Sequence, residues 1–242
     1  MSLSPTLLTA DKLVASQASY VTASVTLNAN KPTYIKVSAE KNGAAEPTSI
    51  TSAGVTWVRV NGTTFATWWS QSVWRAMAST AQTGAITINF AAAHDACAWS
   101  VIEWTGADTS GTNGSGSVVQ SAINTGTGTS LSVTLAAFGD AVNNAAFGAF
   151  MQADSGDQNI SAGAGFIELS DVYAATGGGF HGQTEWKLGQ DTSVDASWGV
   201  AGAGSGGVAI EVKAAASAGV LYTQLERGIR GMNRGMNTGG YR

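Results

Sequence analysis

Apolar and polar side chains alternate along most of this chain. The alternation is clearest at residues 20–27, 34–39, 86–90, 130–135, 184–188 and 208–213. Successive side chains of a β-strand point to opposite faces, so a period of two predicts strands with one core face and one solvent face. No βαβ rhythm interrupts the pattern. The chain is therefore expected to be all-β.

Two segments are apolar at consecutive positions, CAWSVIEWT (97–105) and AAFGAFMQA (145–153). Such runs predict central strands that are covered on both faces. Further strands are expected at residues 55–60, 64–69, 72–78, 164–170, 179–183 and 195–200.

Turn-forming residues separate these segments. They cluster at residues 61–62 (Asn-Gly), 109–117, 124–130, 154–159, 176–179 and 202–207. Many short strands at close spacing predict an antiparallel β-sandwich or jelly roll of about a dozen strands. No fixed-period repeat and no interior linker stands out, so residues 1–215 are expected to form one domain.

Composition narrows the class of protein. Charged residues make up 12% of the 242 residues and hydrophobic residues 44%, which favours a folded body over disorder. The single cysteine, Cys97, excludes an intramolecular disulfide and is interpreted as a small buried hydrophobe. No apolar run approaches the ~18 residues of a membrane helix. The first residues resemble no signal peptide, so folding in a cytoplasm is expected.

The C-terminal segment, residues 216–242, differs from the body. All 16 acidic residues lie in residues 1–226, whereas the last sixteen residues carry four arginines and no acid. At helical spacing one face would hold Leu221, Leu225, Ile229, Met232 and Met236, and a second stripe would hold Arg227, Arg230 and Arg234.

Glycines interrupt this pattern at Gly228, Gly231 and Gly235, each costing about 1 kcal/mol of helix propensity. The segment is therefore expected to be a short helix or an extended arm that a neighbouring chain orders on docking. The alternative is a flexible, solubilising tail. Binding of nucleic acid is disfavoured because the body is acidic and the charges are few.

Candidate chemistry is sparse. His94 and Asp95 are adjacent, so they point apart on an extended chain and predict a loop pair rather than an acid–base pair. The DSGDQN stretch (154–159), like Asp108 and Asn113, is interpreted as a hydrated turn, and its spacing is not that of a calcium loop. Glu103 is expected to pair with Arg75 or Arg59. No catalytic residue, metal site or cofactor is predicted.

Eight tryptophans offer a different kind of site. Trp68 and Trp69 are adjacent and would face opposite sides of a strand, so one of them could leave the core. Exposed tryptophans stack on sugar rings or anchor interfaces. A carbohydrate-binding module for host surface glycans is therefore the alternative function, and a sugar-active enzyme ranks last because no carboxylate pair is singled out.

Six segments in this order resemble jelly-roll-like domains of structural proteins in tailed bacteriophages and prophages. They are GVTWVRV (54–60), SVWRAMA (72–78), GAITINF (84–90), WSVIEWTGADTSGTNGSGSVVQS (99–121), TSLSVTLAAFGD (129–140) and GGVAIEVKA (206–214). The resemblance implies a non-enzymatic virion component, head-decorating or tail-associated. It further implies docking on other virion proteins and assembly as a homo-oligomer, for which a trimer is expected.

Overall fold

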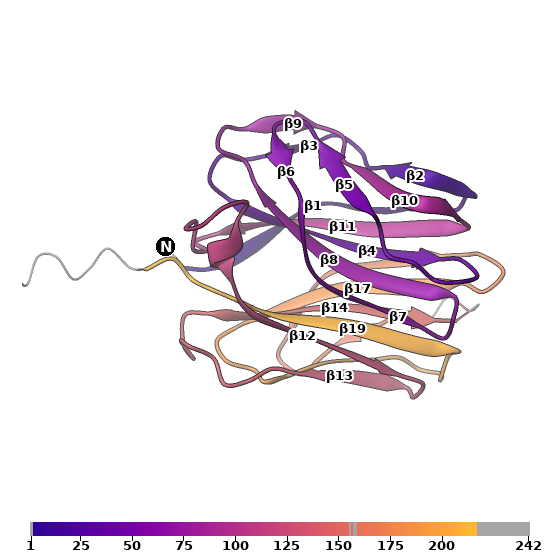
Figure 1. The fold of residues 1–242 in the computed structure, drawn as a ribbon. Helices are drawn as coiled ribbons and strands as arrows, with labels where there is room; N and C mark the ends of the chain where they lie inside the picture. Colours follow the sequence, from indigo (N-terminus) through magenta and orange to yellow (C-terminus); the bar gives the residue numbers. More distant parts are fainter. Residues whose placement is uncertain (1, 155, 157–158, 217–242) are drawn as a thin grey trace, which may run out of the picture.

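The computed structural model describes residues 2–154, 156 and 159–216, which form 19 strands and one 3-10 turn (Figure 1). The strands pair in antiparallel sheets, and the described residues contain no α-helix. This confirms the all-β antiparallel prediction. The strands outnumber the expected dozen because several span only two or three residues.

The first half of the chain folds into one sandwich. Its larger sheet has the order β1 (Ser4–Leu13), β11 (Ala96–Thr105), β4 (Pro32–Glu40), β8 (Trp69–Met77), β7 (Val58–Phe65). The facing sheet has the order β2 (Gln17–Val21), β10 (Thr87–His94), β5 (Ser49–Ser52), β6 (Val55–Thr56). A short pair, β3 (Val25–Leu27) and β9 (Gln82–Gly84), closes one end.

The second half repeats this plan. After the 3-10 turn Ser115–Ser117, the larger sheet has the order β12 (Val118–Gly126), β19 (Gly204–Val212), β14 (Ala145–Ala153), β17 (Phe180–Leu188), β16 (Ile167–Ala174). The outer sheet has the order β13 (Ser130–Thr134), β18 (Ser193–Ser197), β15 (Ser161–Ala162).

Strand order is the same in both halves. When the five strands of each larger sheet are numbered in chain order, both sheets have the order first, fifth, second, fourth, third. In each half the chain passes several times between the two sheets, and the hairpins β7–β8 and β16–β17 stay within one sheet. The structure thus contains a repeated topology that the sequence does not show as a periodic repeat, because alternation fixes which face is buried and leaves residue identity free.

Four sheets stack as layers, and a core fills each of the three spaces between them (Figure 1). The first core packs residues such as Tyr20 and Ile88 of the outer sheet against Trp99. The middle core joins the two halves through Trp104 and Phe147, and the third packs Phe150 against Val194. The two larger sheets are thus covered on both faces, which is why β14 is buried along its whole length and β11 along all but its last residue.

Several predicted boundaries were wrong, and residues 20–27 belong to two strands, β2 and β3, rather than to one. Asn61 and Gly62 do not form a turn but lie inside β7, beside a register shift that absorbs the extra residue. The predicted strand 64–69 is broken by Ala66 and Thr67, which adopt positive φ. The glycines of residues 202–207 begin β19, where Gly206 and Gly207 leave room for the rings of Phe65 and Phe150.

Candidate functional site

The predicted docking residues, Leu221 to Met236, lie outside the described residues. The structure does describe the point from which that segment departs. β19 ends at Val212, and the chain continues through Lys213 to Ala216 at the end of the body where residue 2 also lies. The residues around this departure point form the candidate site.

Four backbone contacts hold the departing chain. Lys213 donates its N–H to the Ser117 carbonyl at 2.9 Å, and its own carbonyl accepts from the N–H of Asp108 at 2.9 Å. Ala215 donates to the Gly106 carbonyl at 2.8 Å, and the N–H of Ala214 donates to Asn144 Oδ1 at 3.0 Å. The C-terminal segment therefore starts from a fixed point.

The partner of this chain is the linker between the two sandwiches, residues 106–117. Gly106 has a φ of +75°, and a Cβ there would lie 2.6 Å from the Ser2 carbonyl oxygen, so only glycine fits. Arg75 donates to the carbonyls of Thr112 and Asn113, and the Tyr34 hydroxyl contacts Ser117. These bonds fix the linker to the first sandwich.

A buried carboxylate fixes the opposite wall. Glu211 is fully buried on β19 and accepts from the backbone N–H of Gly139 at 3.0 Å, Asn144 Nδ2 at 2.6 Å and Gln120 Nε2 at 2.7 Å. Gly139 and Asn144 belong to the loop between β13 and β14, and Gln120 on β12 contacts the same loop at Ala136, so these bonds hold the loop in place. The wall is therefore shaped before anything docks on it.

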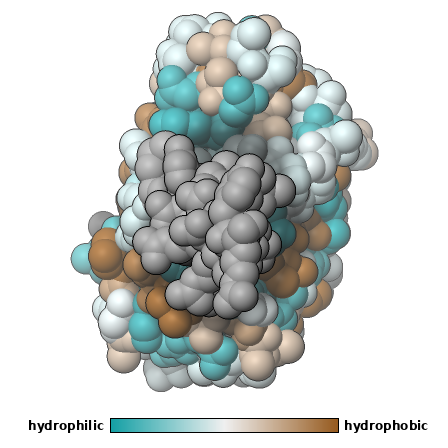
Figure 2. Space-filling model, turned by 90° about the vertical axis from the view of Figure 1, so that its left-hand side faces the viewer, coloured by the Kyte–Doolittle hydropathy of each residue, from teal (hydrophilic) through white to brown (hydrophobic). Residues whose placement is uncertain are grey.

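Between these walls lies a groove of about 880 Å³. It is lined by the linker, the loop 139–144, Leu3 and the departing chain. Three of its lining side chains are large, apolar and exposed: Val142 (74%), Val119 (45%) and Leu188 (45%). Figure 2 views this end of the molecule and shows hydrophobic side chains gathered mainly over its lower half, which the second sandwich forms. We call these features the exit groove.

The rim of the exit groove carries two carboxylates. Asp108 forms an ion pair with Lys213 at 2.7 Å, and this contact lowers the pKa of Asp108. Asp140 accepts hydrogen bonds from the side chain and backbone of Asn143 and from the Val142 N–H, which lower its pKa. Both carboxylates are therefore charged at neutral pH, and the single basic side chain of the lining, Lys213, is already paired.

Comparison of the chain with protein-family models, with curated proteins and with solved structures finds no match. Function is therefore argued from the geometry. Within the described ranges no helix is long and apolar enough to cross a membrane, and no cluster of three or more His, Cys, Asp or Glu side chains could hold a metal.

The two tryptophans that were proposed to bind glycans differ in exposure. Trp69 is buried and stacks on Phe65, whereas Trp68 is 40% exposed. Trp68 follows Ala66 and Thr67, whose positive φ values are costly for residues with a Cβ. Loop 41–44 supports the turn, because Lys41 donates to the Trp68 carbonyl, and Gly43 and Ala44 donate to that of Thr67. Of this pair, Trp68 alone could contact a ligand.

The remaining candidate side chains are buried or form contacts with other residues of the body. His94 is buried and contacts the carbonyls of Ala92 and Ala45 through its two ring nitrogens. His181 pairs with Asp171 at 3.4 Å beside a small polar pocket of about 320 Å³. Cys97 is buried, and burial raises the pKa of its thiol. The DSGDQN stretch falls partly outside the described residues.

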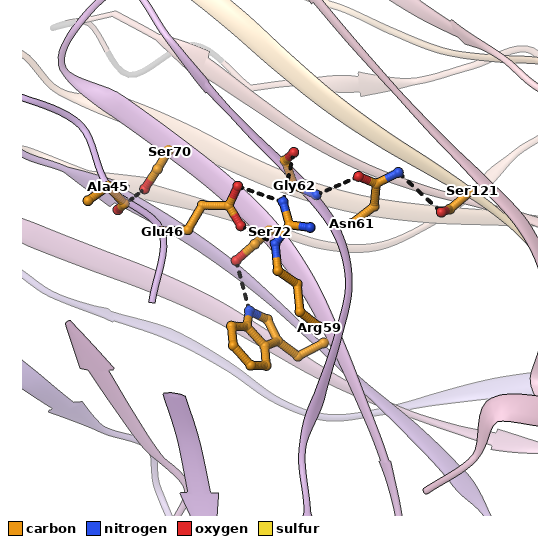
Figure 3. A network of polar contacts seen from close by, with 9 residues as sticks. Ala45, Glu46, Arg59, Asn61, Gly62, Ser70, Ser72 and Ser121 are labelled. Carbon is orange, nitrogen blue, oxygen red and sulfur yellow. Dashed lines mark hydrogen bonds and ion pairs between the residues drawn. The ribbon is translucent and has the colours of Figure 1, made fainter. Parts of the chain in front are cut away.

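The predicted partner of Glu103 was wrong. Glu103 is buried and pairs with Lys31 at 3.2 Å, and it accepts from the backbone and side chain of Asn28. Arg59 instead binds Glu46 through two nitrogens, as Figure 3 shows. Spacing along the chain could not reveal these pairs, because the partners belong to loops that only the fold brings together.

Figure 3 also shows how the two sandwiches meet at their edges. Asn61, displaced by the register shift in β7, donates from Nδ2 to Ser121 Oγ on β12 at 3.1 Å. The halves are joined by the middle core, by a second buried cluster that includes Phe65, Met151 and Phe180, by this edge contact and by the linker.

Proposed function

We propose that this protein is a non-enzymatic structural component of a tailed-bacteriophage virion, attached to the head or the tail. In this role residues 216–242 dock the body on other virion proteins. The protein assembles as a homo-oligomer, with a trimer as the working state, in the host cytoplasm and remains in the released virion.

The observation that carries the proposal is the anchored departure of the C-terminal segment at the exit groove. Four hydrogen bonds fix Lys213 to Ala215, so the position of the body sets where the segment begins. A segment that starts from a fixed point can place its body in register on a repeating lattice. The apolar and arginine rows of residues 221–236 supply contacts for a partner surface.

The body supports the same reading. Buried apolar clusters fill every space between the stacked sheets and hold the body together. The resemblance of six segments to phage structural domains supports a tailed-bacteriophage virion as the particle. Head and tail attachment are both compatible with this geometry.

Removing the docking segment tests the proposal. Phage particles are assembled with either the full chain or a variant ending at Ala216, purified on a density gradient, and probed for the chain by immunoblot. We expect the truncated variant to lose about tenfold or more of its occupancy, because several apolar side chains no longer bury on the particle. Thermal unfolding of the truncated body serves as the folding control.

The Trp68→Ala variant distinguishes docking through the C-terminal segment from glycan binding. We expect particle occupancy of this variant to be unchanged, because Trp68 is not part of the docking segment. Undiminished occupancy of the truncated variant would contradict the proposal, and a loss of host-glycan binding in Trp68→Ala would favour the carbohydrate-binding module instead.

A further inference from the structure

The exit groove has apolar walls but no described side chain that fills it. Val142, Val119 and Leu188 surround one concave surface, although each would be more stable in contact with another apolar group. Gathering of exposed large apolar side chains around one hollow marks an interaction surface. The question is what the groove binds.

The chain itself carries a complementary segment. Leu221, Leu225, Ile229, Met232 and Met236 recur at a spacing that gives one apolar face. The arginines of the neighbouring stripe match the carboxylate of Asp140 on the groove rim, whereas Asp108 is already paired with Lys213. Methionine adapts its shape to irregular surfaces, which suits the mixed walls of the groove. The match is thus in both hydrophobicity and charge.

Geometry favours a groove on another copy over the chain's own groove. Ala214 to Ala216 already form part of the wall, and only residues 217–220 separate them from Leu221. Filling its own groove would require residues 217–220 to form a tight turn back over the wall, whereas a segment from a second copy needs no such reversal. A helix over residues 221–236 would be about 24 Å long, so it could span from one body to the next.

We infer that the exit groove is the acceptor for the apolar row of residues 221–236 from a second copy of this chain. Each copy then gives one segment and receives one, which produces a reciprocal pair or a ring where the rotation between copies closes. This inference rests on the proposed function, since it takes residues 216–242 to be a docking element, and it names the groove and the partner that the element uses.

Disulfide trapping between two singly substituted chains tests the inference with purified protein. One chain carries Val142→Cys and the other Met232→Cys, and the two are co-expressed and oxidised mildly with diamide. Cys97 does not interfere, because it is buried and its thiol pKa is raised. We expect a disulfide-linked heterodimer on a non-reducing gel, since such a bond joins two chains by construction.

Val200→Cys is the matched control for Val142→Cys. Val200 is also an exposed valine, at 56%, but it lies near the far end of β14, where its carbonyl accepts from Gln152. Heterodimers with Val142→Cys and none with Val200→Cys support the inference. Equal trapping at both positions, or no trapping at either, would overturn it.

A double variant with both Val142→Cys and Met232→Cys on one chain tests whether the segment binds the groove of its own chain. A linked monomer without linked oligomers would place the segment in its own groove and overturn the inference. Light scattering supplies a second readout: Val142→Asp should weaken self-association about tenfold, and Val200→Asp should not. Failure of these tests leaves particle docking open, because they contain no particle.

Discussion

Replacing Trp104 with alanine is expected to lower the free energy of unfolding by about 3–5 kcal/mol, the usual cost of removing a large aromatic side chain from a packed core. Trp104 is fully buried in the core between the two sandwiches. Its ring contacts those of Tyr34 and Phe147 at centroid distances of 5.9 Å and that of Trp186 at 6.2 Å. The substitution removes all three contacts and leaves a cavity where the halves join.

Urea unfolding followed by circular dichroism measures this effect. Trp68→Ala is the matched control, because it deletes the same side chain from an exposed turn and should cost well under ~1 kcal/mol beyond any change in the turn itself. If Trp104→Ala were no more destabilising than the control, the middle core would not hold the two halves together.

Replacing Lys36 should have the second large effect on the free energy of unfolding, and this substitution should stabilise the fold rather than destabilise it. Lys36 lies on β4 in the contact between the two larger sheets, is fully buried, and points at Gly182 on β17. Its Nζ finds no hydrogen-bond acceptor among the residues that the structure describes. Burial lowers the pKa of Lys36 to about 7, with the charge of Asp171 acting in the opposite direction. The fold therefore disfavours the ammonium form.

Lys36→Met is expected to raise the free energy of unfolding at pH 7 by about 2–4 kcal/mol, since methionine keeps a long unbranched side chain without a charge to desolvate. The pH profile should change as well. In the native sequence the unfolded state binds more protons between pH 7 and about 10.5, so stability rises with pH across that window. The variant should lose this rise.

Urea unfolding at a series of pH values from 6 to 10 checks both parts. Lys12→Met is the control, because Lys12 is exposed on β1 and should leave the profile unchanged. A flat profile in the native sequence, or a destabilised Lys36→Met variant at pH 7, would show that Lys36 is satisfied in the fold.

Much of the fold was accessible from the sequence. The prediction for residues 145–153 coincides with β14, and that for residues 97–105 differs from β11 by one residue. Both strands are apolar on two faces, which is a strong local signal. β1, β5 and β12 were missed, because their alternation is weak and several of their side chains face solvent at sheet edges or outer layers.

The division into two sandwiches was not accessible. Each half needs one outer and one inner sheet, and the inner sheets bury both faces only because they stack on each other. Nothing local marks this contact. Residues 109–117, which make up most of the linker, were correctly predicted to be turn-rich, but the role of the linker as anchor for Lys213 and Ala215 depends on strands that are a hundred residues apart.

Only part of the candidate site could be predicted from the sequence. Sequence patterning identified the rows of residues 221–236, whereas the exit groove emerges only when loop 139–144, the linker and Leu188 come together. Val142 offered no sequence signal, because a single valine in a polar loop is common. Its significance comes from its 74% exposure beside two other exposed apolar side chains.

Mass spectrometry of gradient-purified phage particles tests the central claim most directly. If this protein is a virion component, its peptides will follow the main structural protein of the particle across the gradient at a constant ratio, and they will persist through a high-salt wash. Recovery of the chain only in the particle-free fractions of the lysate would contradict the claim.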